Sequence, residues 1–214
     1  KAHGQTVILL HGSSMNSAMW IDDIQTLSHY YRVIALDIPG EPGKSDERQL
    51  SFESDDYAYW LSEVFSLLKI GQAYPECVEK AVLLAPAGIG SQNPEFAVRA
   101  MQLLPKGDTG VTELFTEING GTAIPKDQLE YQKLITSVFN ARQEIIPLFT
   151  DEDLKKLSMP CMILLGEKDI MIQSQETKER AVRFISPCTV RQYPEKGHSL
   201  VGMEQEILHF LQDT

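Results

Sequence analysis

Two carboxylates and a histidine follow apolar runs of the sequence, and together they could carry out acid–base chemistry. Glu167 and Asp169 come shortly after the run Cys161–Leu165, and His198 comes shortly after the run Cys188–Tyr193. An imidazole titrates near neutral pH, and it can shuttle a proton when a carboxylate fixes its tautomer. These loops therefore predict a general base, His198, that is oriented by one of the two acids.

Another loop could supply a hydrogen-bond donor to a developing negative charge. His11-Gly12-Ser13-Ser14 follows the apolar run Thr6–Leu10. Gly12 is expected to let the backbone turn sharply and to leave the N–H of Ser13 free to face an oxyanion, with the N–H of Ser14 as the alternative. His11 is expected to have a structural role within this loop rather than to carry a proton.

Five short apolar runs predict the strands of a mostly parallel sheet. Four of them are continuous and rich in β-branched or aliphatic residues, which is typical of strands buried on both faces. The fifth is more polar, so we expect it at an edge. Ligands of such sheets bind at the carboxyl ends of the strands. Asp37, at one such end, is expected to hold its own loop by hydrogen bonds. The runs are Thr6–Leu10, Val33–Leu36, Ala81–Leu84, Cys161–Leu165 and Cys188–Tyr193.

Helical periodicity fills the intervals between these strands. Thr150 stands at a suitable N-cap position for one helix, whose acidic first turn suits the helix dipole. The alternation of strands and helices predicts an α/β fold with a mostly parallel sheet flanked by helices. The expected helices are Asp55–Leu68, Asp151–Leu157, Gln175–Phe184 and Glu204–Leu211.

The segment 92–149 interrupts this alternation. It contains helical stretches over Glu95–Leu104, Val111–Ile118 and Lys126–Asn140, separated by glycine-containing turns, and it shows no clear strand. We interpret it as a helical insertion that forms a cap, or lid, over a cleft at the strand ends.

Composition excludes several classes of function. Thirty acidic residues against 19 Lys and Arg give a net charge of −11 in 214 residues, and this charge disfavours nucleic acid and anionic membranes as partners. No apolar run is long enough to span a membrane. Three cysteines are too few for a disulfide framework and indicate buried thiols in a reducing, cytoplasmic compartment. Neither the cysteines nor any other cluster has metal-ligand spacing.

The sequence resembles the α/β-hydrolase superfamily over nearly its whole length, and more loosely the capped bacterial carboxylesterases of that superfamily. Blocks that look like the family's oxyanion strand, glycine loop, post-nucleophile strand, acid loop and histidine loop occur in the family's order. The resemblance implies an α/β-hydrolase core over 1–91 and 150–214 with a helical cap over 92–149, and it selects Asp169 over Glu167 as the acid. The matching blocks are VILLHGSSMNSAMW, VIALDIPGEPGKSD, YPECVEKAVLLAPAG, ILLGEKD and YPEKGHSL.

The sequence departs from the family in one respect, because it contains no G-x-S-x-G nucleophile elbow. The family places a strand, the elbow and a helix, on the order of 20 residues, where only Gly71-Gln72-Ala73 stand between Ile70 and Tyr74. Three explanations are open: the segment is missing from this sequence but belongs to the natural chain, it has been deleted in a non-catalytic relative, or the likeness is fortuitous. Lys1 in place of a Met, with no leading β-hairpin, leads us to expect missing upstream residues as well.

The resemblance implies a serine hydrolase, and most closely a carboxylesterase for small, fairly apolar esters. A serine absent from this sequence would attack the ester carbonyl, His198 would take and return the proton, Asp169 would hold the imidazole, and the Ser13 N–H would stabilise the oxyanion. No cofactor and no metal are expected, and a homodimer is left open. The alternatives are a non-catalytic ligand-binding relative and another chemistry on the same fold, such as a C–C hydrolase, a lyase or a haloperoxidase-like enzyme.

Overall fold

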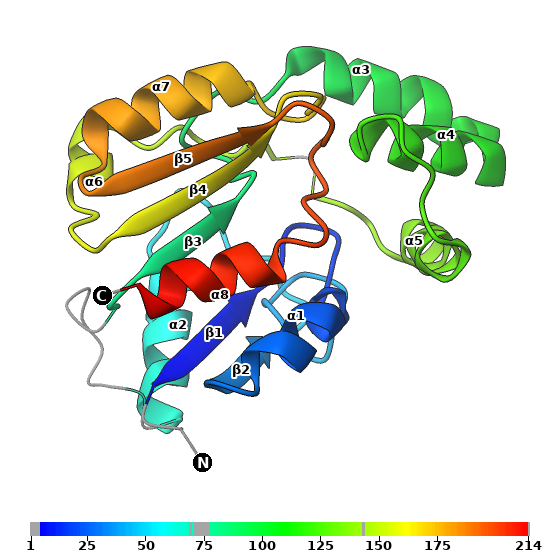
Figure 1. Cartoon of the computed structure of the whole chain (residues 1–214). Coiled ribbons are helices and arrows are strands. Elements are labelled where there is room, and N and C mark those ends of the chain that lie inside the picture. The colour runs from blue at the N-terminus through cyan, green and yellow to red at the C-terminus, as the bar shows by residue number, and fades with distance from the viewer. Residues whose placement is uncertain (1–4, 69, 71–77, 143, 214) are drawn as a thin grey trace. The chain divides into compact units, whose positions relative to one another are not determined.

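The computed structural model describes residues 5–68, 70, 78–142 and 144–213 (Figure 1). The chain divides into two compact units, each with its own parallel sheet. The first unit consists of residues 1–77, 135–144 and 202–214, and the second of residues 78–134 and 145–201. The segment around residues 71–77, where the sequence lacks the elbow, lies outside the described residues.

In the first unit, β1 (Thr6–Leu10) pairs in parallel with β2 (Arg32–Leu36). The short helices η1 (Ser17–Trp20) and α1 (Ile21–Leu27) connect the two strands. Sequence periodicity did not indicate α1, because seven residues complete barely two helical turns. Figure 1 shows α1 beside the C-terminal helix, with which it is in contact. The unit also contains α2 (Asp56–Leu67) and that C-terminal helix, α8 (Glu204–Gln212).

In the second unit, three parallel strands lie in the order β3 (Ala81–Leu84), β4 (Cys161–Gly166) and β5 (Cys188–Tyr193). Every residue of β4 is buried, whereas β5 alternates and lies at the edge of the sheet, as its polar sequence predicts. The helices α6 (Asp151–Lys155) and α7 (Ser174–Phe184) pack together, and α7 contacts both β4 and β5. The predicted strands and the four predicted core helices are thus confirmed to within three residues at each end.

The prediction that four strands are buried on both faces is confirmed for β4 but is wrong for β1, β2 and β3 in the described chain. In β1, Leu9 is buried but Leu10 is 40% exposed, and no residue of β3 is fully buried. Among the described residues, β1 pairs with β2 alone and β3 pairs with β4 alone. Both strands are apolar enough for the interior of a sheet, yet each keeps one edge without a neighbouring strand. This is the arrangement that the absence of a strand next to each of them would produce.

The expected helical insertion forms α3 (Pro94–Leu103), η3 (Leu104–Lys106), α4 (Asp108–Ile118) and α5 (Lys126–Val138). Figure 1 shows α3 and α4 beyond the carboxyl ends of β4 and β5, within the same compact unit. The boundary between the two units falls inside α5. That the segment 92–149 acts as a cap stays a prediction.

Candidate active site

The loops after β4 and β5 bring an acid and a histidine into direct contact. Nδ1 of His198 lies 2.8 Å from Oδ2 of Asp169. The Asp169 side chain is completely buried, whereas the His198 side chain is 27% exposed. A buried carboxylate at this distance can hold an imidazole in one orientation while the far ring nitrogen stays accessible.

The other carboxylate oxygen of Asp169 is bound by the backbone of its own loop. Oδ1 accepts hydrogen bonds from the N–H groups of Met171 at 2.7 Å and Ile172 at 3.1 Å. Donors of this kind fix the plane of the carboxylate. Because Oδ1 is used in this way, Oδ2 is directed at His198, and the hydrogen bond places the imidazole proton on Nδ1. Nε2 of His198 is then the nitrogen that can accept a proton.

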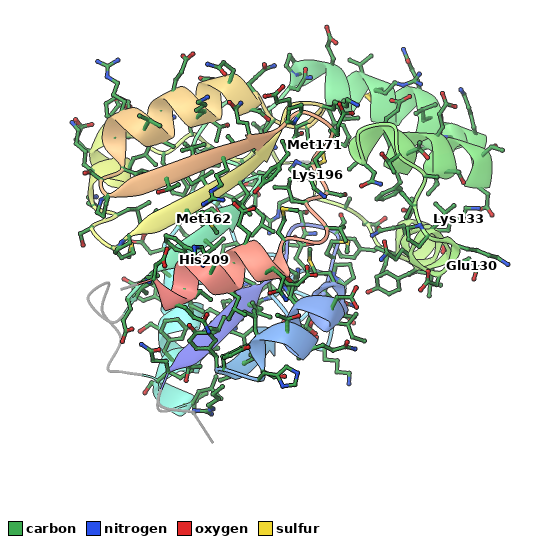
Figure 2. All side chains as sticks on the ribbon, in the orientation of Figure 1. Glu130, Lys133, Met162, Met171, Lys196 and His209 are labelled. Atoms are coloured by element: carbon green, nitrogen blue, oxygen red, sulfur yellow. The ribbon has the colours of Figure 1, made fainter. Side chains whose placement is uncertain are left out.

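Glu167, the competing acid, takes a different position. Glu167 is exposed, and its backbone N–H donates to the carbonyl of Tyr193 at 3.0 Å. The N–H of Lys168 likewise donates to the carbonyl of Lys196 at 3.0 Å. Backbone hydrogen bonds therefore join the acid loop to the histidine loop, and Asp169 is the acid that they bring to His198. Figure 2 marks the two loops by the side chains of Met171 and Lys196.

The loop after β1 contains a free donor and an occupied one. The N–H of Ser14 donates to Oε2 of Glu41 at 2.6 Å, and the hydroxyl of Ser13 donates to Oε1 of the same carboxylate at 3.3 Å. Among the described residues, the N–H of Ser13 has no hydrogen-bond acceptor. Of the two N–H groups considered for an oxyanion, that of Ser13 is therefore the available one. No sequence pattern indicated a role for Glu41, which lies 27 residues beyond Ser14.

The turn in this loop is not made by Gly12, as the sequence led us to expect. The residue with left-handed backbone is Ser14, at φ 59°. A Cβ atom on Gly12 would meet no heavy atom within 4 Å. The carboxylate of Glu41 offsets the cost of the left-handed backbone at Ser14, because it accepts hydrogen bonds from the N–H of Ser14 and from the hydroxyl of Ser13.

His11 and Asp37 hold the loops after β1 and β2, as predicted. Nε2 of the buried His11 accepts the N–H of Ile38 at 2.9 Å, and Nδ1 lies 2.8 Å from the carbonyl of Gly12, so the tautomer with its proton on Nδ1 satisfies both contacts. The carboxylate of Asp37 accepts the N–H groups of Ser17 and Lys44. Burial acts to raise the pKa of Asp37, but these hydrogen bonds outweigh it and hold the pKa below its usual value.

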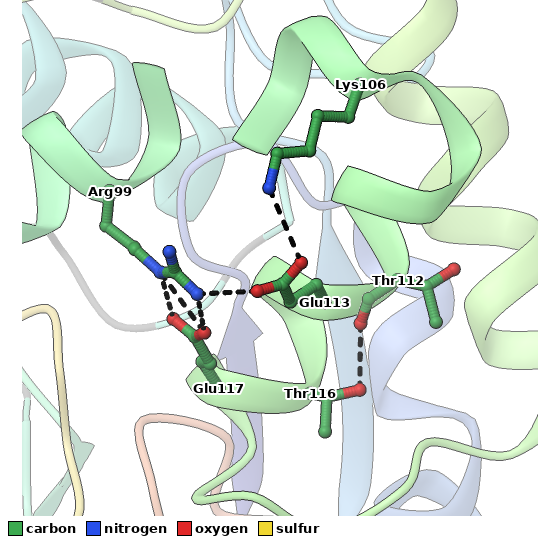
Figure 3. Close-up of polar contacts among 6 residues, drawn as sticks. All are labelled: Arg99, Lys106, Thr112, Glu113, Thr116 and Glu117. Carbon is green, nitrogen blue, oxygen red and sulfur yellow. Dashed lines mark hydrogen bonds and ion pairs between the residues drawn. The ribbon is translucent and has the colours of Figure 1, made fainter. Parts of the chain in front are cut away.

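Near the acid loop, α3 and α4 border a hollow of about 420 Å³, which Ile170 also lines. Its cationic side chain, Arg99, is already bound by two glutamates of α4 (Figure 3). Nε of Arg99 donates to Glu117 at 2.9 Å, and Nη2 donates to Glu113 at 2.6 Å. The hydrogen bond from Arg99 lowers the pKa of Glu117, and the two carboxylates neutralise the guanidinium. The hollow therefore offers no free positive charge to an anion.

Two classes of feature are absent from the part of the chain that the structure describes. No group of three or more His, Cys, Asp or Glu side chains there could hold a metal ion. None of the helices there combines the length and apolar character needed to cross a bilayer.

Ser13 belongs to the first compact unit, and His198 and Asp169 belong to the second.

Two bacterial esterases resemble the chain over most of its length. It is 27% identical to carboxylesterase YbfK of Bacillus subtilis (strain 168), with 94% of this chain and 76% of the relative covered. It is also 27% identical to the uncharacterized carboxylesterase nap of the same organism, with 93% and 74% covered. The crystal structure of YbfK superposes with a TM-score of 0.81, over 97% of this chain and 84% of the other.

The alignments also show that the chain lacks residues that its relatives have. The match to YbfK extends over 227 positions and that to nap over 236, more than the 214 residues of this chain. Both relatives therefore have residues inside the matched region that this chain lacks. This agrees with the absence of an elbow segment.

Fold, loop geometry and sequence comparison lead to the same assignment. Parallel strands flanked by helices carry an acid and a histidine on neighbouring loops at their carboxyl ends. The model of the alpha/beta hydrolase family matches residues 7–208. The chain belongs to the alpha/beta hydrolase family.

Proposed function

We propose that this protein is a carboxylesterase that hydrolyses small, fairly apolar esters with a Ser-His-Asp triad. The observation that carries the proposal is the 2.8 Å contact between the buried Asp169 carboxylate and the partly exposed imidazole of His198. The names of the two relatives, both carboxylesterases, support the choice of ester bonds. Family membership alone would leave other reactions equally open.

In this proposal each residue has a defined role. Nε2 of His198 takes the proton of the attacking serine hydroxyl and later returns it to the leaving alkoxide. Asp169 holds the imidazole and stabilises the imidazolium ion that forms. The free N–H of Ser13 donates to the oxyanion of the tetrahedral intermediate. Water then attacks the acyl-enzyme, with His198 as the base, and releases the carboxylic acid.

The nucleophile belongs to a segment that this sequence does not contain. We place that segment between Ile70 and Tyr74, where the family has its strand, elbow and helix. Two observations support a missing strand: the unpaired apolar edges of β1 and β3 among the described residues, and alignments longer than the chain itself. A strand in that segment would provide a neighbour for an edge of this kind and would end in the serine.

A second candidate function is a non-catalytic ligand-binding relative. The specific observation in its favour is that the described residues include an acid, a base and a free N–H, whereas the sequence contains no G-x-S-x-G motif. A natural protein with an intact mass of 24.0 kDa and no turnover of any ester would support it. Substrate profiling against esters and C–C bonds would separate the esterase from other hydrolases of this fold.

A cytoplasmic location is part of the proposal. Cys161 and Cys188 are free thiols, and burial raises the pKa of both, so neither is set up to react. This state fits a reducing compartment. The homodimer stays a prediction.

The test is to express the complete gene and to assay short-chain nitrophenyl esters. We expect the gene to encode a G-x-S-x-G segment and its product to be active. His198→Ala should lower kcat/KM by at least about 10³-fold. The matched control is His209→Ala, because His209 is an exposed histidine on α8. The absence of turnover above the His198→Ala background would reject the esterase.

A further inference from the structure

The C-terminal turn of α4 lies directly against the loop that carries His198. The backbone N–H of His198 donates to the carbonyl of Ile118, the last residue of α4, at 2.8 Å. Two glycines with left-handed backbone then end the helix, Gly120 at φ 70° and Gly121 at φ 84°. The N–H of Gly121 donates to the carbonyl of Thr116, which caps the helix. The histidine loop is therefore bound to a helix of the segment 92–149.

The contact is between backbones, with no side chain between them. A Cβ atom on Gly120 would lie 2.7 Å from the N of Gly197, and a Cβ atom on Gly197 would lie 2.3 Å from the carbonyl oxygen of Ile118. A Cβ atom on Gly166, at the end of β4, would lie 2.1 Å from the carbonyl oxygen of Gly197. The histidine loop thus passes between β4 and α4 at distances that only glycine allows. Backbone cannot move aside by changing a rotamer, so this contact sets the position of the loop.

The same helix also contacts the acid loop. Ile118 and Leu114 of α4 form a buried apolar cluster with Leu103 of α3. Ile170 and Met171 of the acid loop pack against this cluster. Ion pairs from Arg99 further join α3 to α4 (Figure 3). One helical hairpin therefore holds the backbones on both sides of the Asp169–His198 contact.

We propose that Gly120 is a positioning residue for His198, acting through the backbone contact of the α4 turn with Gly197. The inference rests on the proposed function, in which His198 is the base. It gives the segment 92–149 a task besides covering a cleft, because its α4 holds the histidine loop in place. A displacement of about 1 Å at a catalytic group can cost about 100-fold in rate.

Gly120→Ala and Gly121→Ala form a matched pair for the test. Both place an alanine at a positive φ and so carry the same kind of backbone strain. A Cβ atom on Gly121 meets no heavy atom within 4 Å, whereas one on Gly120 would push against the histidine loop. In the complete protein, we expect Gly120→Ala to lower kcat for a nitrophenyl ester about 10- to 100-fold with KM changed less than about 2-fold. Gly121→Ala should change kcat less than about 2-fold.

A second readout separates this inference from the esterase itself. The hydrogen bond between Nδ1–H of His198 and Asp169 should give a downfield proton resonance, absent in His198→Ala. Gly120→Ala should shift or broaden it, and Gly121→Ala should leave it unchanged. A protein without esterase activity that shows this difference would overturn the proposed function but retain the positioning role. Equal effects of the two variants on kcat and on the resonance would overturn the positioning role.

A second pair of variants covers the case in which Gly120→Ala does not fold. Ile118→Ala and Leu114→Ala each remove a buried side chain from the same cluster on the same helix. Ile118 is the one of the two whose backbone carbonyl accepts the N–H of His198; the alanine variant keeps that carbonyl but loses the packing that holds it in place. Both should destabilise the fold similarly. Ile118→Ala should lower kcat at least about 5-fold more than Leu114→Ala in protein that is still folded. Equal kcat values would contradict the proposal.

Discussion

The partly buried carboxylate of Asp23 makes the stability of the first unit depend on pH. Asp23 lies in the first turn of α1, which contacts α8. Burial, and secondly the negative charge of Glu204 on α8, raise the pKa of Asp23 from 3.8 to about 6. Folding therefore favours the protonated form of this side chain. Replacing it by a neutral isostere, Asp23→Asn, should stabilise the protein wherever the aspartate would be charged.

The size of the effect follows from the pKa difference. A rise from 3.8 to about 6 corresponds to a cost of about 3 kcal/mol when the folded protein carries the charge. Asp23 is only partly buried, and water screens part of that cost. We therefore expect Asp23→Asn to raise the free energy of unfolding by about 1 to 3 kcal/mol at pH values above about 7.

The sign of the pH dependence is also determined. Between the unfolded pKa and the folded pKa, the folded state binds more protons than the unfolded state, so this residue makes stability fall as the pH rises. The gain from Asp23→Asn should be near zero at about pH 4 and complete above about pH 7. Most of the change should occur between these values.

The assay is urea unfolding of the wild type and the variant at several pH values. The matched control is Asp22→Asn, since Asp22 is the exposed neighbour in the same helical turn. Glu204→Gln should reproduce part of the gain, because it removes the second cause of the raised pKa. A gain from Asp23→Asn that is the same at acidic and alkaline pH, or that Asp22→Asn equals, would refute the reasoning.

Three further predictions concern the site and its supports. Asp169→Asn should lower kcat/KM about 10³- to 10⁴-fold in the complete protein with little loss of stability, since it removes the carboxylate that selects the His198 tautomer; a loss below about 10-fold would contradict this role. Glu41→Ala should lower kcat for a nitrophenyl ester about 10-fold by loosening the loop at Ser14, whereas Glu41→Gln, which keeps an acceptor oxygen, should restore most of it; equal rates would contradict this. Thr150→Ala should cost about 1 kcal/mol of unfolding free energy, measured in urea, by removing the N-cap hydrogen bond of α6, and Thr150→Ser should recover it.

Local patterns predicted most of the elements correctly. β1, β3 and β5 have the bounds expected from their apolar runs, and Thr150 caps α6 through the N–H of Asp153. These features depend on neighbours a few residues apart, so the sequence contains the information directly. The short α1 was missed because a helix of seven residues gives too little periodicity and depends on its contact with α8.

The order of strands and loops was enough to indicate that an acid and a histidine meet, because consecutive parallel strands bring their carboxyl ends to one edge of the sheet. The composition and the order of the elements could not decide which backbone N–H and C=O groups are already hydrogen-bonded within the protein and which remain free. That Glu41 takes the N–H of Ser14 and leaves that of Ser13, and that Ile118 holds the backbone of His198, are contacts between residues far apart in the sequence. Such contacts depend on distances of a few tenths of an ångström between separate segments, and only the packing of the folded chain determines them.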